Sequence, residues 1–323
     1  MRKAALIDIA GNPVVMPEKD TALSLGKPVK TTYYSMDEWR DGRSTTIGGS
    51  EASAILGLNP YLSPFELYSL KAGLVEPDNG AESEVLEWGS RLEQPIVEAY
   101  QDKTNRKIKR HGIHTFRSPN YPLSVSLDGE IEPIDDRGPG VLEIKTTGLY
   151  SEKDLQESVP VEWQIQCNHA MAIMGWRWAS LAIFIIHSRK FRYLDIERND
   201  QFIEMLLRKE LDFVKRIEDN NPPIVDGSDS TTEVLKRLYP NDSGETIQLP
   251  SDATKWDAEL VRLKSQIQDA EKRKTELENL FRAALGTATF GVGDDGLKYS
   301  WRLQHRDSYY VKESEYRVLR RLK

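Results

Sequence analysis

The stretch Ser126-Leu127-Asp128-Gly129, followed after a short polar loop by Val141-Leu142-Glu143-Ile144-Lys145, predicts two adjoining strands that carry two carboxylates and an ammonium group. Side chains alternate between the faces of a strand, so Glu143 and Lys145 point the same way while their apolar neighbours point into the core. Two carboxylates crowded at the end of apolar strands repel each other and lose hydration. A bound cation would offset that cost.

Hard oxygen ligands of this kind suit Mg²⁺, and Mn²⁺ is expected to substitute for it. A lysine beside such an ion is typical of phosphodiester-cleaving sites, where the metal activates water and neutralises charge on the scissile phosphate. The bare pattern, Asp128 followed by Glu143-x-Lys145, also arises by chance in charged sequences. The alternative interpretation is a β-hairpin with a surface salt bridge that contributes well under about 1 kcal/mol.

Residues 43–57 predict a loop, an N-cap at Ser50 and a short helix that ends at Gly57. Free N–H groups at a helix start attract anions. Arg43 precedes that start by seven residues and could bind the same anion with a bidentate contact. An ordinary glycine turn with a helix cap is the competing explanation.

Two further helices are predicted to carry polar residues on apolar faces. Residues 86–100 place Glu93 on the same stripe as the core residues Val97 and Tyr100, although an edge position that reaches solvent would also explain Glu93. Residues 160–175 place Gln164 at the front of an apolar face, where its amide needs partners. Two strands are expected next, a fully buried one over 178–186 and another over 190–196.

Taken in order, these motifs resemble the PD-(D/E)xK nuclease superfamily, and within it the lambda-exonuclease-like, or YqaJ-type viral recombinase, branch. The resemblance covers about residues 43–217, and Leu127 replaces the first proline of the family pattern. Five ordered motifs carry it: I-G-G-S-E-A at 47–52, W-G-x-x-x-E at 88–93, S-x-D-G at 126–129, L-E-I-K at 142–145 and Q-I-Q at 164–166.

The resemblance implies an α/β fold, with a restriction-endonuclease-like core of mixed sheet flanked by helices. It also implies that Asp128, Glu143 and the backbone carbonyl of Ile144 bind the metal. Lys145 would orient the attacking water or stabilise the phosphorane. Glu93 would be a helix carboxylate near a second ion.

The same resemblance makes Gln164 a residue that lines the site. Arg43, Ser50 and Ser126 become candidates for holding a terminal 5′-phosphate. Some relatives bind that phosphate with an arginine shortly after the ExK lysine, but here residues 151–153 are Ser-Glu-Lys. That particular contact therefore has no counterpart at the expected place.

The function implied is a magnesium-dependent DNA exonuclease of phage or prophage recombination. It would resect double-stranded ends 5′ to 3′ as a ring-shaped homo-oligomer and leave 3′ single strands for an annealing protein. Two alternatives stay open: a non-catalytic DNA-end-binding or scaffolding protein, and an endonuclease built on the same core. The intact set of Asp128, Glu143 and Lys145 argues against the non-catalytic alternative.

Composition restricts the setting. The chain has 323 residues, a net charge of −7 and one cysteine, Cys167, which excludes a disulfide framework and a four-cysteine iron–sulfur cluster. The N-terminal apolar run is too short for a signal peptide or membrane span, so a cytoplasmic location in a bacterial host is expected. Although the net charge is negative, residues 103–117 form a basic stretch that could bind the phosphate backbone of duplex DNA. A solvated surface is the alternative interpretation of this stretch.

The predicted organisation has three parts: an N-terminal extension over 1–40, the nuclease core over 41–225 and a C-terminal extension over 226–323. In the last part, residues 251–285 predict a long helix with a narrow apolar seam, typical of a coiled coil or an intersubunit contact. Packing of this helix on its own nuclease core is the other interpretation. A small hairpin and a basic helical segment over 316–323 are expected to follow.

Overall fold

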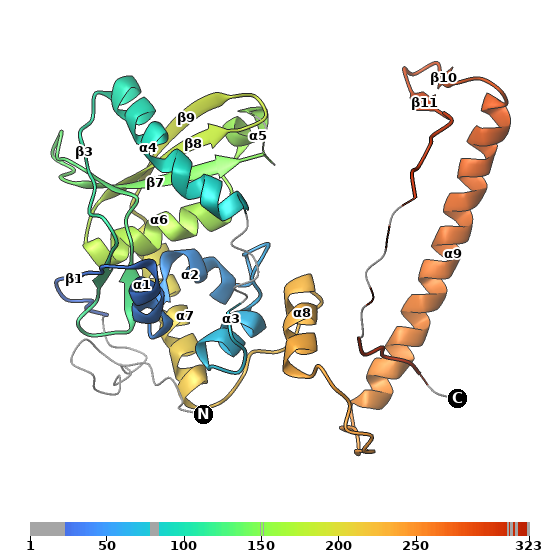
Figure 1. The fold of residues 1–323 in the computed structure, drawn as a ribbon, viewed down its shortest axis with the longest axis horizontal. Helices are drawn as coiled ribbons and strands as arrows, with labels where there is room; N and C mark the ends of the chain where they lie inside the picture. Colours follow the sequence, from blue (N-terminus) through green and yellow to red (C-terminus); the bar gives the residue numbers. More distant parts are fainter. Residues whose placement is uncertain are drawn as a thin grey trace. The chain divides into compact units, whose positions relative to one another are not determined.

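The structure, a computed structural model, describes residues 23–77, 84–148, 150, 152–308, 310, 313 and 316–321. The chain divides into two compact units, Met1–Tyr239 and Pro240–Lys323. The first unit contains all the strands and helices expected of the nuclease core (Figure 1). The second contains the long helix and the hairpin.

A five-stranded mixed sheet forms the centre of the first unit. Its strands, in spatial order, are β3 (Ile108–Lys109), β6 (Gly129–Ile131), β7 (Gly140–Thr147), β8 (Trp178–Ile185) and β9 (Lys190–Glu197). Among these five strands only β7 and β8 pair in parallel, and the connection between them contains the helix α6 (Val161–Met174). The predicted mixed α/β fold is confirmed.

A second sheet of four strands lies beside the first. In spatial order it contains β1 (Val29–Thr32), β4 (His114–Arg117), β5 (Leu123–Val125) and β2 (Ile47–Gly48). Because β1 pairs with β4, residues 29–32 belong to this sheet and are not a separate extension. Residues 1–22 of the predicted N-terminal extension lie outside the described residues.

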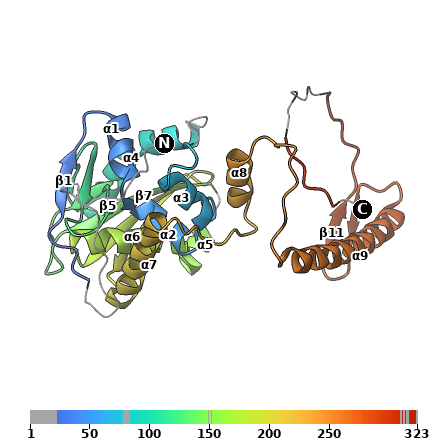
Figure 2. The ribbon, with the colours of Figure 1, turned by 90° about the horizontal axis from the view of Figure 1, so that it is seen from below.

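Helices cover both faces of the central sheet, as Figures 1 and 2 show. The helix α4 (Glu84–Thr104) packs Val97 and Tyr100 against Leu142 and Ile144 on one face. On the other face, α6 packs against β7 and β8. Alternation along β7 therefore points Leu142 and Ile144 at α4 and leaves Val141, Glu143 and Lys145 on the α6 side.

The remaining helices of the first unit surround α6 and the smaller sheet. They are α1 (Met36–Ser44), α2 (Gly49–Ile55), α3 (Pro64–Lys71), α5 (Glu152–Glu157), α7 (Asp200–Glu218) and α8 (Asp229–Leu238). Local sequence explains their ends: Ser63 caps α3 ahead of its proline, and Gly175, at φ +70°, ends α6 as predicted.

The first unit extends past residue 225, where the core was expected to end. The helix α8 lies on α3, where the Thr231 hydroxyl donates to the Ser63 hydroxyl at 2.9 Å and Arg237 forms an ion pair with Glu66 at 3.6 Å. Val234 of α8 is fully buried. The compact unit therefore includes α8 and ends at Tyr239.

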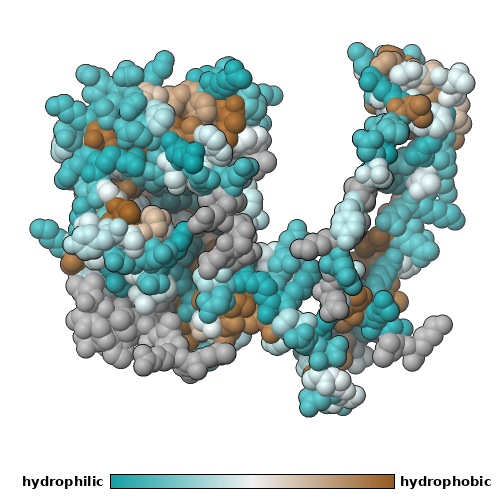
Figure 3. All heavy atoms as spheres, in the orientation of Figure 1, coloured by the Kyte–Doolittle hydropathy of each residue, from teal (hydrophilic) through white to brown (hydrophobic). Residues whose placement is uncertain are grey.

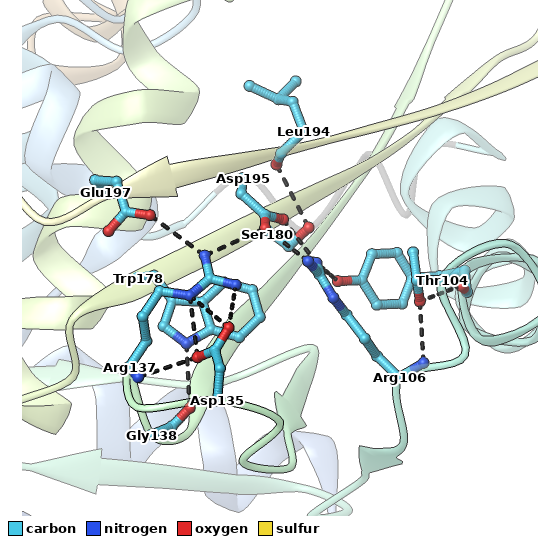
Figure 4. Close-up of polar contacts among 11 residues, drawn as sticks. Thr104, Arg106, Asp135, Arg137, Gly138, Trp178, Ser180, Leu194, Asp195 and Glu197 are labelled. Carbon is cyan, nitrogen blue, oxygen red and sulfur yellow. Dashed lines mark hydrogen bonds and ion pairs between the residues drawn. The ribbon is translucent and has the colours of Figure 1, made fainter.

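A group of charged and aromatic side chains fastens β8 and β9 to their surroundings (Figure 4). Arg106 donates to both oxygens of Asp195 at 2.7 Å, and Arg137 reaches the same carboxylate at 3.4 Å. Their guanidinium groups lie 4.9 and 4.2 Å from the ring centre of the buried Trp178. Arg106, part of the predicted basic stretch, is thus a structural residue.

The second unit consists of α9 (Ala253–Leu285) and a hairpin of β10 (Phe290–Val292) and β11 (Lys298–Ser300). The predicted long helix is confirmed. The predicted basic helix is wrong for residues 316–321, which have no regular secondary structure. In the part of the chain that the structure describes, no helix is both long and apolar enough to cross a membrane.

Candidate active site

Asp128, Glu143 and Lys145 meet where β6 begins beside the middle of β7. Gly129 lies opposite Leu142, which brings the preceding Asp128 alongside Glu143. An Asp128 oxygen accepts the backbone N–H of Ile144 at 2.7 Å, and Lys145 Nζ lies 2.8 Å from Glu143 Oε1. The predicted shared face of Glu143 and Lys145 is confirmed. The strand predicted over 126–129 is wrong for residues 126–128, because β6 begins only at Gly129.

The electrostatics of this group follow from burial of like charges. Burial raises the pKa of Asp128 well above its ordinary value, and the neighbouring Glu143 carboxylate raises it further. Burial alone would lower the pKa of Lys145, but the Glu143 carboxylate outweighs it and the pKa is raised. The site thus holds the charged ammonium group of Lys145 beside two carboxyl groups, those of Asp128 and Glu143.

Glu93 reaches the same region from α4. Its negative charge also contributes to the raised pKa of Asp128, after burial and Glu143. Its carboxylate pairs with Arg110 at 2.7 Å, so its charge is partly neutralised. The predicted proximity of Glu93 to the acidic pair agrees with this arrangement, and Arg110 is an additional residue at the edge of the site.

Gln166, and not Gln164, contacts the site. Gln166 Oε1 accepts a hydrogen bond from Lys145 Nζ at 2.8 Å, whereas the exposed Gln164 donates to the backbone carbonyl of Val159 at 2.8 Å. Residues two apart on a helix point in nearly opposite directions, so only one glutamine of the Q-I-Q motif can face β7. The assignment of Gln164 as a residue that lines the site is wrong.

A histidine missed by the sequence analysis supports the chain just before Asp128. Burial lowers the pKa of His114 to about 4, which leaves the ring neutral, and its Nε2 accepts the N–H of Leu127 at 3.2 Å. The Ser126 hydroxyl donates to the carbonyl of His114 at 2.7 Å and accepts the indole N–H of Trp39 at 3.0 Å. Ser126 therefore has a structural role here, and its contact with a phosphate stays a prediction.

Arg43 and Ser50, two of the predicted phosphate-binding residues, touch each other. Arg43 donates to the Ser50 hydroxyl at 3.2 Å, and its guanidinium lies 4.6 Å from the ring centre of Trp39. Within the described ranges, Arg43 forms no ion pair. Trp39 connects this arginine to Ser126 and hence to the segment that carries Asp128.

The predicted cap at Ser50 is wrong. The helix α2 begins at Gly49 with Gly48 at the cap position, because β2 continues to Gly48. The N–H of Gly48 donates to Glu51 at 2.8 Å, and Glu51 is paired with the buried Lys71 at 2.9 Å. Since this carboxylate occupies the helix start, an anion near Ser50 would depend on Arg43 and not on free helix N–H groups.

A fully buried ion pair lies behind the site. His169 of α6 contacts Glu210 of α7 at 2.7 Å, and its other ring nitrogen lies 3.0 Å from the carbonyl of Ser124 on β5. Burial opposes the charged ring, but Glu210 outweighs it and raises the pKa of His169. The helix that carries Gln166 thereby also anchors the strand that leads to Asp128.

The donor set fits a divalent cation of the hard type. Asp128 and Glu143 offer two adjacent carboxylates as oxygen donors, and burial beside Glu143 raises the pKa of Asp128, an effect that a bound cation would oppose. Among the described residues, no three His, Cys, Asp or Glu side chains are grouped as a ready-made metal cage. The carbonyl of Ile144 and the carboxylate of Glu93 stay predicted ligands.

A mixed sheet that presents two acids and a lysine at adjoining strands is the arrangement implied by the PD-(D/E)xK resemblance. The profile of the YqaJ-like viral recombinase domain matches residues 38–177. The uncharacterized protein YqaJ of Bacillus subtilis (strain 168) is 30% identical over 267 residues, which are 81% of this chain and 82% of that protein. The chain belongs to the YqaJ-like viral recombinase family.

Two solved structures are also similar. The alkaline exonuclease LHK-Exo of Laribacter hongkongensis aligns with 62% of this chain and 97% of its own, at 20% identity and a TM-score of 0.47. The phage-related exonuclease of Haemophilus somnus 129PT aligns with 54% of this chain and 94% of its own, at 11% identity and a TM-score of 0.42.

Proposed function

We propose that this chain is a metal-dependent DNA exonuclease that uses Mg²⁺, or Mn²⁺ in its place. It resects double-stranded ends 5′ to 3′ and leaves 3′ single strands for an annealing protein, and it acts as a homo-oligomer. The observation that carries the proposal is the meeting of Asp128, Glu143 and Lys145, with the pKa of Asp128 raised by burial and by Glu143.

Each residue of the set has a distinct task. Asp128 and Glu143 would hold the cation, and the bound ion supplies Lewis acidity and a nucleophilic hydroxide at neutral pH. Lys145, kept charged by Glu143 and oriented by Gln166, places a fixed positive charge where the phosphate gains negative charge. The Ile144 N–H holds the Asp128 carboxylate in place.

The contact between Arg43 and Ser50 favours an exonuclease over an endonuclease. An arginine that lies on Trp39 and donates to Ser50 suits a dianionic terminal phosphate, because Glu51, the carboxylate on which its charge acts, is already paired with Lys71. Trp39 ties this arginine to the segment that carries Asp128. Binding the terminal phosphate beside the metal site would direct cleavage to a 5′ end.

Digestion of linear and closed-circular duplex of one sequence, with Mg²⁺ and with EDTA, tests the proposal. We expect Mg²⁺-dependent loss of linear DNA only, with mononucleotides released from labelled 5′ ends. Cleavage of the closed circle would support an endonuclease instead. Binding of linear ends without cleavage in Mg²⁺, and in a repeat of the assay with Mn²⁺, would support the non-catalytic alternative.

Arg43→Ala is expected to lower the rate on 5′-phosphorylated ends by about 10-fold or more, since a hydrogen bond to a charged group contributes about 1.5–3 kcal/mol. The rate on 5′-hydroxyl ends should change little. The measurement is the ratio of initial rates on the two substrates. Arg40→Ala, an exposed arginine on the same helix that pairs with Asp37, is the matched control. An unchanged ratio in Arg43→Ala would make the contact with Ser50 purely structural.

A further inference from the structure

The helix α9 exposes a continuous apolar seam. It is 33 residues long and has no buried residue. Its apolar side chains recur at alternating spacings of four and three, the a and d positions of a heptad repeat, and Figure 3 shows apolar atoms on the surface of this unit. The seam consists of Trp256, Leu260, Leu263, Ile267, Ala270, Leu277 and Phe281, and the polar Lys274 occupies the position of the same repeat between Ala270 and Leu277.

The second unit itself leaves most of this seam uncovered. Trp256, Leu260 and Ile267 are 58%, 46% and 56% exposed. The hairpin contacts only the far end, where Phe281 stacks on Tyr299 at 4.0 Å. Ion pairs between neighbouring turns, such as Arg262 with Glu259 and Lys274 with Glu278, stabilise α9. Because helices in proteins gain most of their stability from packing of an apolar face, a partner along the seam would stabilise it further.

The charges beside the seam identify the partner. In a parallel in-register pair of coiled helices, each g position faces the e position five residues later on the other helix. Here Glu259 would face Lys264 of the second copy, and Arg273 would face Glu278. Both pairs are attractive. An antiparallel pair that aligns the same seam would place Asp257 opposite Glu278, which is repulsive, and Lys264 opposite Glu271, which is attractive, so these contributions cancel.

We propose that α9 forms a parallel, in-register coiled coil with α9 of a second copy of this chain. Leu263 and Leu277 at d positions would pack across the seam, and Lys274, the one polar residue at an a position of the repeat, would fix the register at some cost in stability. The inference is independent of the nuclease activity, because α9 belongs to the other compact unit.

Cysteine cross-linking of the full-length chain tests the pairing and its direction. The native Cys167 is fully buried and will not react. Leu263→Cys and Ala270→Cys, at d positions, are each expected to form disulfide-linked dimers under mild oxidation. Ser265→Cys and Lys272→Cys, at the outward f positions, are the matched controls. Equal linkage at d and f positions would overturn the proposal, and linkage at only one d position would overturn the parallel register.

Exchange of the flanking charges tests the specificity. Glu259→Lys with Glu278→Lys makes all four flanking residues positive, and Lys264→Glu with Arg273→Glu makes all four negative. Each double variant alone should lose dimerisation through α9, while a mixture should recover heterodimers, as measured by pull-down of differently tagged chains at low salt. Circular dichroism checks that α9 stays helical. Efficient self-pairing of either double variant would refute the proposal.

Discussion

Asp128→Asn and Glu143→Gln are each expected to abolish DNA cleavage while DNA binding survives. Either change removes a carboxylate that would hold the cation, and a bound metal ion supplies several kcal/mol of transition-state stabilisation. The rate should therefore fall on the order of 10³-fold, since each 1.4 kcal/mol is a factor of ten. Binding should persist or tighten, because less negative charge faces the phosphates.

The measurements are single-turnover digestion of linear duplex and a binding titration in Ca²⁺. Asp212→Asn, an exposed carboxylate on α7, serves as the control for loss of one negative charge. Activity retained above a few per cent in either site variant would remove that residue from the proposed metal site. Loss of binding together with cleavage would point to a folding defect.

Lys145→Ala is expected to lower the cleavage rate by at least about 10²-fold, as for loss of one fixed charge at a developing anion. Gln166→Leu should cost less, about 10-fold, because Glu143 still holds the lysine. Gln164→Leu should behave as wild type, since its side chain contacts the carbonyl of Val159. Equal losses in the two glutamine variants would contradict the placement of Gln166 alone beside Lys145.

The sequence predicted the central part of the fold because its strands have strong local patterns. The alternation of apolar and charged residues over 141–145 determined which face carries Glu143 and Lys145. The helix predicted over 160–175 is present as α6, which ends at the glycine at 175. These features depend only on residues that are close together in the chain, so they can be predicted from one sequence.

The errors concern contacts between distant segments. The helix α6 is buried on several sides, including Ile165, Cys167 and His169, so no apolar stripe marks the side that faces β7. The sequence pattern therefore does not show which of Gln164 and Gln166 faces Lys145. The roles of Trp39 and His114 depend on contacts with a residue more than ten positions away. No local pattern predicts them.

The end of the first unit was misplaced for a similar reason. Residues 226–228 have the polar composition of a linker, and α8 joins the core through hydroxyl contacts with Ser63 and through Val234. The start of α2 was misplaced because the pairing of β2 with β5 determines where the helix can begin. Both errors arise from contacts with segments distant in the sequence, namely α3 for α8 and β5 for β2.

The crowding of Asp128 and Glu143 also has a thermodynamic consequence. The folded chain retains a proton at Asp128 over a pH range in which the unfolded chain has released it, so the free energy of unfolding falls as pH rises from about 4 through the raised pKa. A cation that binds only the folded chain recovers this loss by mass action. Substitutions at Asp128 would then stabilise the empty protein, so a selection for thermal stability alone would favour inactive variants.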